Sequence, residues 1–114
     1  MNRRLELGRD GERRAAEWYR ARGYTIRDRN WRTRNGELDL IVDRGDEVVF
    51  CEVKTRSSAA YGRGVDAVGF RKQRRLRSLA LQWLQGQRRR YADVRFDVAD
   101  VDGDGTVEII EGCF

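Results

Sequence analysis

The feature that most constrains the fold is a pair of apolar segments separated by a tight turn. Residues 37–43 (ELDLIVD) and 47–55 (EVVFCEVKT) are rich in valine, leucine and isoleucine, and a Gly-Asp pair at 45–46 separates them. Glycine at the first central position suits a two-residue type II′ turn. We therefore expect an antiparallel β-hairpin in which Arg44 faces Glu47 and regular pairing continues along both strands.

The segments around this hairpin predict two helices. Residues 10–22 place apolar side chains on one face at helical spacing. Asp10 is the expected N-cap of this helix and Gly23 its expected end. A second helix is expected from about residue 66 to residue 85. Its apolar stripe consists of Leu76, Leu79, Ala80, Trp83 and Leu84.

Three further strands complete the prediction. Residues 24–33, 94–101 and 106–110 have the mixed apolar and polar pattern of half-buried strands. The element order is then α-β-β-β-α-β-β, which predicts an α/β fold with a central mixed β-sheet flanked by helices. A chain of 114 residues suits one compact domain, spanning residues 1–114.

The composition excludes several classes of active site. The chain contains no histidine, which rules out Ser-His-Asp and Cys-His centres. Its two cysteines, Cys51 and Cys113, lack zinc-site spacing, and Cys51 is expected to be a buried, inert thiol. A metal would therefore have oxygen ligands, which favour Mg²⁺ or Mn²⁺. The net charge of +5 favours a polyanionic partner, although it also fits a well-solvated surface.

The choice of basic residues is uneven. Of the 24 basic residues, only Lys54 and Lys72 are lysines. Arginine stays charged and forked, whereas lysine is a compact charge whose pKa shifts easily. Lys54 is therefore a candidate for a chemical role; the alternative is chance, since two lysines must fall somewhere.

The expected hairpin gathers charged residues on one face. With regular pairing, Asp39 lies opposite Glu52, and Glu37 lies opposite Lys54. The same face carries three apolar side chains, those of Ile41, Val48 and Phe50. Facing carboxylates destabilise a sheet, so either one of them is protonated or a divalent cation lies between them. Lys54 could then orient water or stabilise developing negative charge. A solvated surface hairpin is the alternative.

These residues resemble a known nuclease signature. The order of Asp39, Glu52 and Lys54 matches the D…ExK motif of the PD-(D/E)xK, or restriction-endonuclease-like, superfamily. The match extends over nearly the whole chain, through Gly11-Glu12, residues 35–41 and 50–56, Tyr61-Gly62, Lys72 and residues 95–97. Together these residues resemble the uncharacterised bacterial YraN-like family. The first half of the chain is also similar to archaeal Holliday-junction resolvases.

The resemblance implies a central mixed sheet and Mg²⁺-dependent phosphodiester cleavage. It implies Asp39, Glu52 and Lys54 as catalytic residues. In the similar resolvases a glutamate early in the first helix joins the metal site, which implies Glu12 as a metal ligand beside Asp39 and Glu52. The chain departs from the motif at Leu38, which stands where the motif has proline, a position at which many members vary.

Basic residues near the second helix are candidates for contact with nucleic acid. Four of them cluster in the first half of that helix: Arg71, Lys72, Arg74 and Arg75. A fifth, Arg56, is the last residue of the motif segment 50–56. Such residues can lie along a phosphate backbone. A solvated helix face is an equally simple explanation.

A calcium loop is a competing pattern near the C-terminal end. Residues 100–111 fit the EF-hand loop. An EF-hand needs a helix on each side, whereas the preceding segment is strand-like and only three residues follow Glu111. We expect a β-turn at 102–105 instead.

The sequence therefore predicts an endonuclease dependent on Mg²⁺ or Mn²⁺, with branched or single-stranded DNA as candidate substrates. The alternatives are a nucleic-acid-binding protein of the same fold without turnover, and a protein-interaction subunit that docks through its basic helix. No apolar run approaches the roughly 20 residues that cross a bilayer, and no signal peptide is evident. A cytoplasmic protein without a membrane partner is expected. Cleavage of a four-way junction would require two active centres and hence a homodimer.

Overall fold

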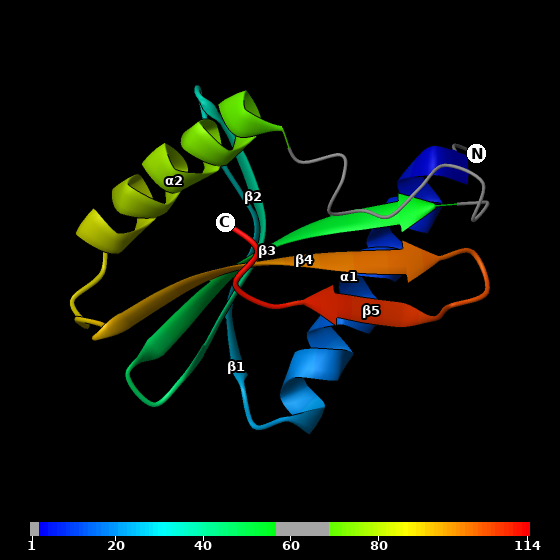
Figure 1. The fold of residues 1–114 in the computed structure, drawn as a ribbon, viewed down its shortest axis with the longest axis horizontal. Helices are drawn as coiled ribbons and strands as arrows, with labels where there is room; N and C mark the ends of the chain where they lie inside the picture. The colour runs from blue at the N-terminus through cyan, green and yellow to red at the C-terminus, as the bar shows by residue number, and fades with distance from the viewer. Residues whose placement is uncertain (1–2, 57–68) are drawn as a thin grey trace.

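A five-stranded mixed β-sheet forms the centre of the molecule, with one helix packed on each face (Figure 1). The computed structural model describes residues 3–56 and 69–114, with side chains from residue 10 to 55 and from 69 onward. The elements are α1 (Arg3–Ala21), β1 (Thr25–Thr33), β2 (Gly36–Arg44), β3 (Glu47–Arg56), α2 (Phe70–Gln85), β4 (Asp93–Asp102) and β5 (Val107–Ile110). The predicted α/β fold and element order are confirmed, and both are consistent with a restriction-endonuclease-like fold.

The strands lie in the sheet in the same order as in the sequence. Neighbouring strands are antiparallel except β3 and β4, which are parallel. Parallel neighbours need a long crossover connection, and α2 provides it. The chain therefore carries α2 across one face of the sheet while α1 covers the other.

The β2–β3 hairpin has the register expected from its turn. Arg44 pairs with Glu47, and regular pairing continues to Leu40 and Cys51. Gly45 has a φ of +59°, a conformation that glycine adopts without a steric penalty. The turn residue and the apolar pattern thus select the same pairing.

Two apolar cores join the sheet to the helices. The core under α1 contains Ala15, Ala16, Tyr19, Tyr24, Leu40, Val42, Val49, Cys51, Ala99 and Val101. The core under α2 contains Leu38, Ile41, Val48, Phe50, Leu76, Leu79, Ala80, Trp83 and Val98. The predicted stripe of α2 and the predicted apolar face of the hairpin therefore pack against each other. Cys51 is buried, and burial raises the pKa of its thiol, as expected of an inert cysteine.

The helix α1 begins earlier than expected. It starts at Arg3, so Asp10 lies inside the helix and is not its N-cap. There Asp10 accepts hydrogen bonds from Arg13 and Arg14, at 2.6 and 2.8 Å, so intrahelical ion pairs, rather than a cap, satisfy its carboxylate. The predicted end is confirmed, because Gly23 has a φ of +87° and follows the last helical residues as a helix-terminating glycine does.

The helix α2 begins at Phe70, later than the expected start near residue 66. Gly69 is its N-cap and makes no side-chain capping bond. The sequence predicts a loop at 56–64; its residues 57–64, together with residues 66–68, lie outside the described residues. Within the described ranges, neither helix is long and apolar enough to span a membrane.

The turn expected at 102–105 connects β4 and β5. The backbone N–H of Asp102 donates to the carbonyl oxygen of Thr106 at 2.9 Å, and Gly105 has a φ of +91°. Strands, not helices, lie on both sides of the turn. The EF-hand interpretation is therefore excluded.

Candidate active site

Asp39 lies at the point where β2 and β3 stop pairing regularly. The last regular pair is Leu40 with Cys51. Beyond it, the backbone N–H of Val53 donates to Asp39 Oδ2 at 2.9 Å. The side chain of Asp39 thus replaces the carbonyl group that would otherwise accept this hydrogen bond. The carboxylate is held between the two strands.

This contact corrects the register expected at the open end of the hairpin. The regular ladder was expected to continue to the pairs Asp39–Glu52 and Glu37–Lys54, but it ends before them. The reason is that a short acidic side chain competes with the backbone for the N–H group of Val53. Sequence alternation alone does not reveal such competition.

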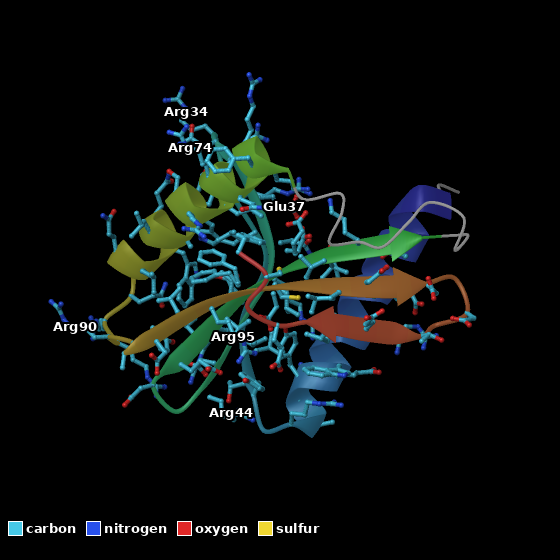
Figure 2. All side chains as sticks on the ribbon, viewed as in Figure 1. Arg34, Glu37, Arg44, Arg74, Arg90 and Arg95 are labelled. Atoms are coloured by element: carbon cyan, nitrogen blue, oxygen red, sulfur yellow. The ribbon has the colours of Figure 1, made fainter. Side chains whose placement is uncertain are left out.

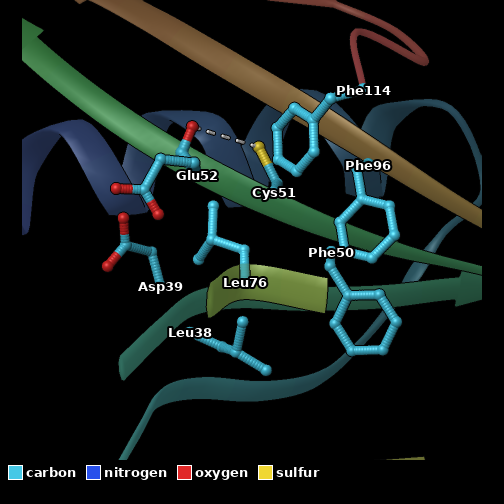
Figure 3. Close-up of a pocket in the computed structure, with 8 residues that line it drawn as sticks. All are labelled: Leu38, Asp39, Phe50, Cys51, Glu52, Leu76, Phe96 and Phe114. Atoms are coloured by element: carbon cyan, nitrogen blue, oxygen red, sulfur yellow. Dashed lines mark hydrogen bonds between the residues drawn. The ribbon is translucent and has the colours of Figure 1, made fainter. Parts of the chain in front are cut away.

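Asp39 and Glu52 nevertheless share one cleft. Their carboxylates face each other in Figure 3. The side chain of Glu52 is only 8% exposed. The cleft has a volume of about 240 Å³ and is lined by Gly36, Glu37, Asp39, Glu52, Lys72, Arg75, Leu76 and Leu79. The two acids of the motif therefore meet between the sheet and α2.

A further group of carboxylates surrounds Asp39. Glu12 of α1, Glu37 and Asp39 each offer one oxygen atom, and these atoms lie within 4.8 Å of one another. Glu12 accepts a hydrogen bond from Asn30 Nδ2 at 2.9 Å, which orients its carboxylate. The structure thus brings Glu12 to Asp39, while Glu52 is not part of this triplet.

A glycine explains how α1 comes close enough for Glu12 to reach the site. Gly11 is buried, and a Cβ atom at this position would collide with the hydroxyl oxygen of Thr55 on β3. The backbone of α1 therefore rests directly against β3. Glu12, the next residue, is carried to the acidic end of the hairpin.

Both lysines of the chain meet at Glu52. Lys72 Nζ lies 2.7 Å from Glu52 Oε1, and Lys54 Nζ lies 3.3 Å from the same oxygen. Lys54 stands two residues after Glu52 on β3, as the motif requires. Lys72 comes from α2 and was expected to contact nucleic acid; the structure places it against a buried carboxylate.

The crowding of charge shifts several pKa values. Burial, together with the neighbouring charge of Glu52, raises the pKa of Asp39 to about 7. Burial, with the adjacent Lys72, lowers the pKa of Lys54. Burial alone would lower the pKa of Lys72 as well, but its hydrogen bond to Glu52 and the nearby negative charges of Glu52 and Asp39 together raise it. The two ammonium groups therefore differ in how readily they lose a proton.

The basic residues of α2 divide into two groups. Arg71, Arg74 and Arg75 are all exposed, and of these three only Arg75 lines the cleft with Asp39. In Figure 2, Arg74 lies at the same edge of the molecule as Arg34 from the β1–β2 turn. The side chain of Arg56, also expected to bind nucleic acid, lies outside the described part of the chain.

Two residues of the site were not identified from the sequence. Glu37 was placed on the correct strand but assigned no role, although its alternation with Asp39 is a usable signal. Asn30 has a φ of +50°, which asparagine tolerates better than most residues. Its contact with Glu12 joins β1 to α1, and no local pattern predicts such a contact.

Comparison with known proteins identifies the family. Residues 11–101 match the family model described as "Uncharacterised protein family UPF0102". A UPF0102 protein of Rhodococcus opacus is 50% identical over 101 residues, covering 89% of this chain and 86% of the relative. A UPF0102 protein of Frankia casuarinae is 48% identical over 118 residues, covering 100% of both chains. One from Myxococcus xanthus is 44% identical over 114 residues, covering 97% of this chain and 90% of the relative. The chain therefore belongs to the uncharacterised, YraN-like family UPF0102.

Proposed function

We propose that this protein is a metal-dependent endonuclease of the PD-(D/E)xK superfamily that hydrolyses phosphodiester bonds in nucleic acid. The observation that carries the proposal is the meeting of Asp39 and Glu52 in one cleft, with Lys54 against Glu52. These are the acid, acid and lysine of the superfamily signature. A structural role alone would not explain carboxylates gathered where they repel one another.

The donor atoms fit a small divalent cation. Glu12, Glu37 and Asp39 offer oxygen atoms within 4.8 Å of one another, and Glu52 faces Asp39 across the cleft. Carboxylate oxygens are the ligands that Mg²⁺ and Mn²⁺ prefer. When bound, such a cation neutralises the acids and polarises phosphoryl oxygens and water.

The chain itself supplies position and positive charge. Lys54, whose pKa is lowered, lies where an ammonium group can orient water and stabilise negative charge on a phosphate. Arg75 lines the same cleft, and the exposed Arg71 and Arg74 extend the basic surface along α2. Together they can hold a phosphate backbone across the cleft.

We infer that the substrate is branched DNA, because the first half of the chain is similar to archaeal Holliday-junction resolvases. Single-stranded DNA is the next candidate. A four-way junction presents two strands for cleavage, so this substrate would require a homodimer. We place the reaction in the cytoplasm.

A cleavage assay with a matched pair of variants tests the proposal. Wild-type protein, Asp39→Asn and Asp46→Asn are incubated with branched, duplex and single-stranded DNA and with RNA, in Mg²⁺, in Mn²⁺ or in chelator. Asp46 lies in the hairpin turn and is exposed, so its variant controls for loss of an acidic charge on the same hairpin. We expect metal-dependent cleavage by wild type and Asp46→Asn, and a loss of at least about 100-fold in Asp39→Asn.

The outcomes separate the candidate functions. Cleavage that persists in Asp39→Asn would point to a contaminating nuclease. Salt-dependent binding without cleavage, equal in all three proteins, would favour the alternative of a nucleic-acid-binding protein of the same fold. If the protein neither cleaves nor binds nucleic acid at moderate salt, nucleic acid is excluded as its partner. The protein-interaction subunit is then the remaining alternative.

A further inference from the structure

We propose that Lys72 is a positioning residue of the active centre: from α2, its ammonium group holds Glu52 in the cleft and leaves Lys54 free to face the phosphate. The inference rests on the proposed function for its catalytic consequence. The placement of Lys72 can be tested separately.

The composition of the chain gives the first argument. Two lysines occur among 24 basic residues, on two different elements, and both lie against the same oxygen of Glu52. Elsewhere in this chain, surface positions that only need a positive charge are occupied by arginine. An ammonium group is compact, so two can approach one carboxylate oxygen, whereas two guanidinium forks would require more room.

The direction of Lys72 on its helix gives the second argument. Arg71 and Arg74, its neighbours on α2, are exposed, while Lys72 is partly buried. Leu76 and Leu79 follow at spacings of four and seven residues and face the sheet, so Lys72 continues the inward face of the helix. Its distance of 2.7 Å from Glu52 is shorter than that of Lys54.

The energetics of Glu52 give the third argument. Its side chain is 8% exposed and faces the carboxylate of Asp39. A buried carboxylate without a partner is strongly unfavourable, so it becomes protonated or moves towards water. The contact with Lys72 offsets this cost and keeps Glu52 inside the cleft.

The two lysines can therefore have different roles in the active centre. Lys72 makes the shorter contact with Glu52, at 2.7 Å against 3.3 Å for Lys54. Lys72 remains a charged partner of Glu52. Lys54, whose contact with Glu52 is longer, is the lysine that can approach a phosphate oxygen.

Kinetics distinguish positioning from substrate binding. We expect Lys72→Met to lower kcat by at least about tenfold with KM changed less than about twofold. Lys72→Arg retains the positive charge and should recover part of the lost activity. The control, Arg20→Met, removes an exposed charge of α1 on the other face of the sheet and should leave both kcat and KM unchanged. A Lys72→Met protein that differs from wild type only in KM would overturn the inference.

A spectroscopic measurement tests the contact without relying on activity. In protein labelled with ¹³C at the lysine ε-carbon, NMR should give two lysine signals, because the chain has two lysines, and Lys54→Arg and Lys72→Arg assign them. We expect Glu52→Gln to shift both signals. If the Lys72 signal matches that of free lysine and does not respond to Glu52→Gln, the proposed placement is wrong.

The two experiments also separate two kinds of failure. If wild-type protein cleaves no substrate, the proposed function fails, and the NMR result still decides whether Lys72 holds Glu52. If wild type cleaves and Lys72→Met is fully active, the proposed function stands and the positioning role proposed for Lys72 is wrong.

Discussion

Asp39 combines burial, like-charged neighbours and a backbone contact in a single side chain. It accepts the N–H of Val53, while Glu52, Glu12 and Glu37 all act to raise its pKa. Without a cation, this group is therefore ionised only at a cost in folding free energy. A positive ion bound beside Asp39 would relieve that cost.

The stability of the cation-free protein should therefore depend on the protonation of Asp39. Its pKa is about 7 in the folded chain, against an ordinary value of 3.8, so its proton stabilises the fold at low pH. This contribution is complete below about pH 4 and is lost as the pH rises to about 7. We expect the free energy of unfolding to fall by roughly 1–3 kcal/mol across this window, relative to Asp39→Asn.

Urea denaturation in chelator at pH 5, 6, 7 and 8 measures how the free energy of unfolding of wild type changes relative to that of Asp39→Asn. Addition of Mg²⁺ at pH 8 should restore stability to wild type and not to Asp39→Asn, since only a site with its carboxylates gains from binding. Parallel pH dependence in the two proteins would show that Asp39 titrates normally.

At the residue scale, the sequence predicts what local alternation can determine. Asp39, Glu52 and Lys54 lie on one short hairpin, so the turn and the period of two bring them together. The partners of Glu12 and Lys72 could not be derived in this way. Glu12 reaches Asp39 through the packing of α1, and Lys72 reaches Glu52 through the placement of α2; both are tertiary contacts.

At the scale of elements, the site depends on how closely α1 approaches the sheet. Gly11 permits that approach against Thr55. Farther along the helix, the hydroxyl of Tyr19 donates to the fully buried Asp97 of β4 at 2.6 Å. Arg95 also binds Asp97, at 2.9 Å. The middle of α1 is thus fixed by close packing and its C-terminal end by a buried polar network.

Gly11→Ala should destabilise the protein although alanine favours helices. The added methyl group must displace Thr55 or move α1, which typically costs about 1–3 kcal/mol, against a gain of at most about 1 kcal/mol from helix propensity. The shift should also move Glu12 away from Asp39 and weaken Mn²⁺ binding. Urea denaturation and calorimetric titration with Mn²⁺ measure the two effects.

The double variant Gly11→Ala/Thr55→Ala provides the control. Removing the hydroxyl group of Thr55 takes away the atom that the new methyl group meets, so stability should recover in part. A stabilised Gly11→Ala single variant would show that α1 does not need this close approach.

The limits of α1 and α2 illustrate why boundaries were harder to predict than elements. The apolar stripe of each helix was clear from the sequence, since it reflects packing. The start of α1 was placed too late because Asp10 resembles a cap, whereas the helix continues back to Arg3 and uses Asp10 for ion pairs. Such a choice depends on competing local interactions of similar strength.

At the scale of the whole molecule, charge separates into an acidic cleft and basic surroundings. Glu12, Glu37, Asp39 and Glu52 converge at the end of the β2–β3 hairpin, and exposed arginines of α2 lie beside them. The arrangement suits a polyanion that is attracted by the surroundings and contacts the cleft through one phosphate.

The salt dependence of DNA binding should show whether this basic surface contacts phosphate groups. With duplex DNA in chelator, Arg71→Met and Arg74→Met should each reduce the slope of log K against log salt concentration by about 0.9, if each removes one phosphate contact. Arg20→Met is the control, because Arg20 is exposed on α1 across the sheet from α2. Fluorescence anisotropy at several salt concentrations measures the slopes. Equal slopes in all the proteins would place the DNA elsewhere.

The proposed chemistry depends most directly on a divalent cation bound among these acids. The decisive measurement is anomalous X-ray scattering from crystals soaked in Mn²⁺, for wild type and for Asp39→Asn. We predict an anomalous peak in contact with Asp39 in wild type, within reach of Glu12, Glu37 or Glu52, and no peak there in Asp39→Asn. Wild-type crystals with Mn²⁺ bound elsewhere and none beside Asp39 would contradict the account.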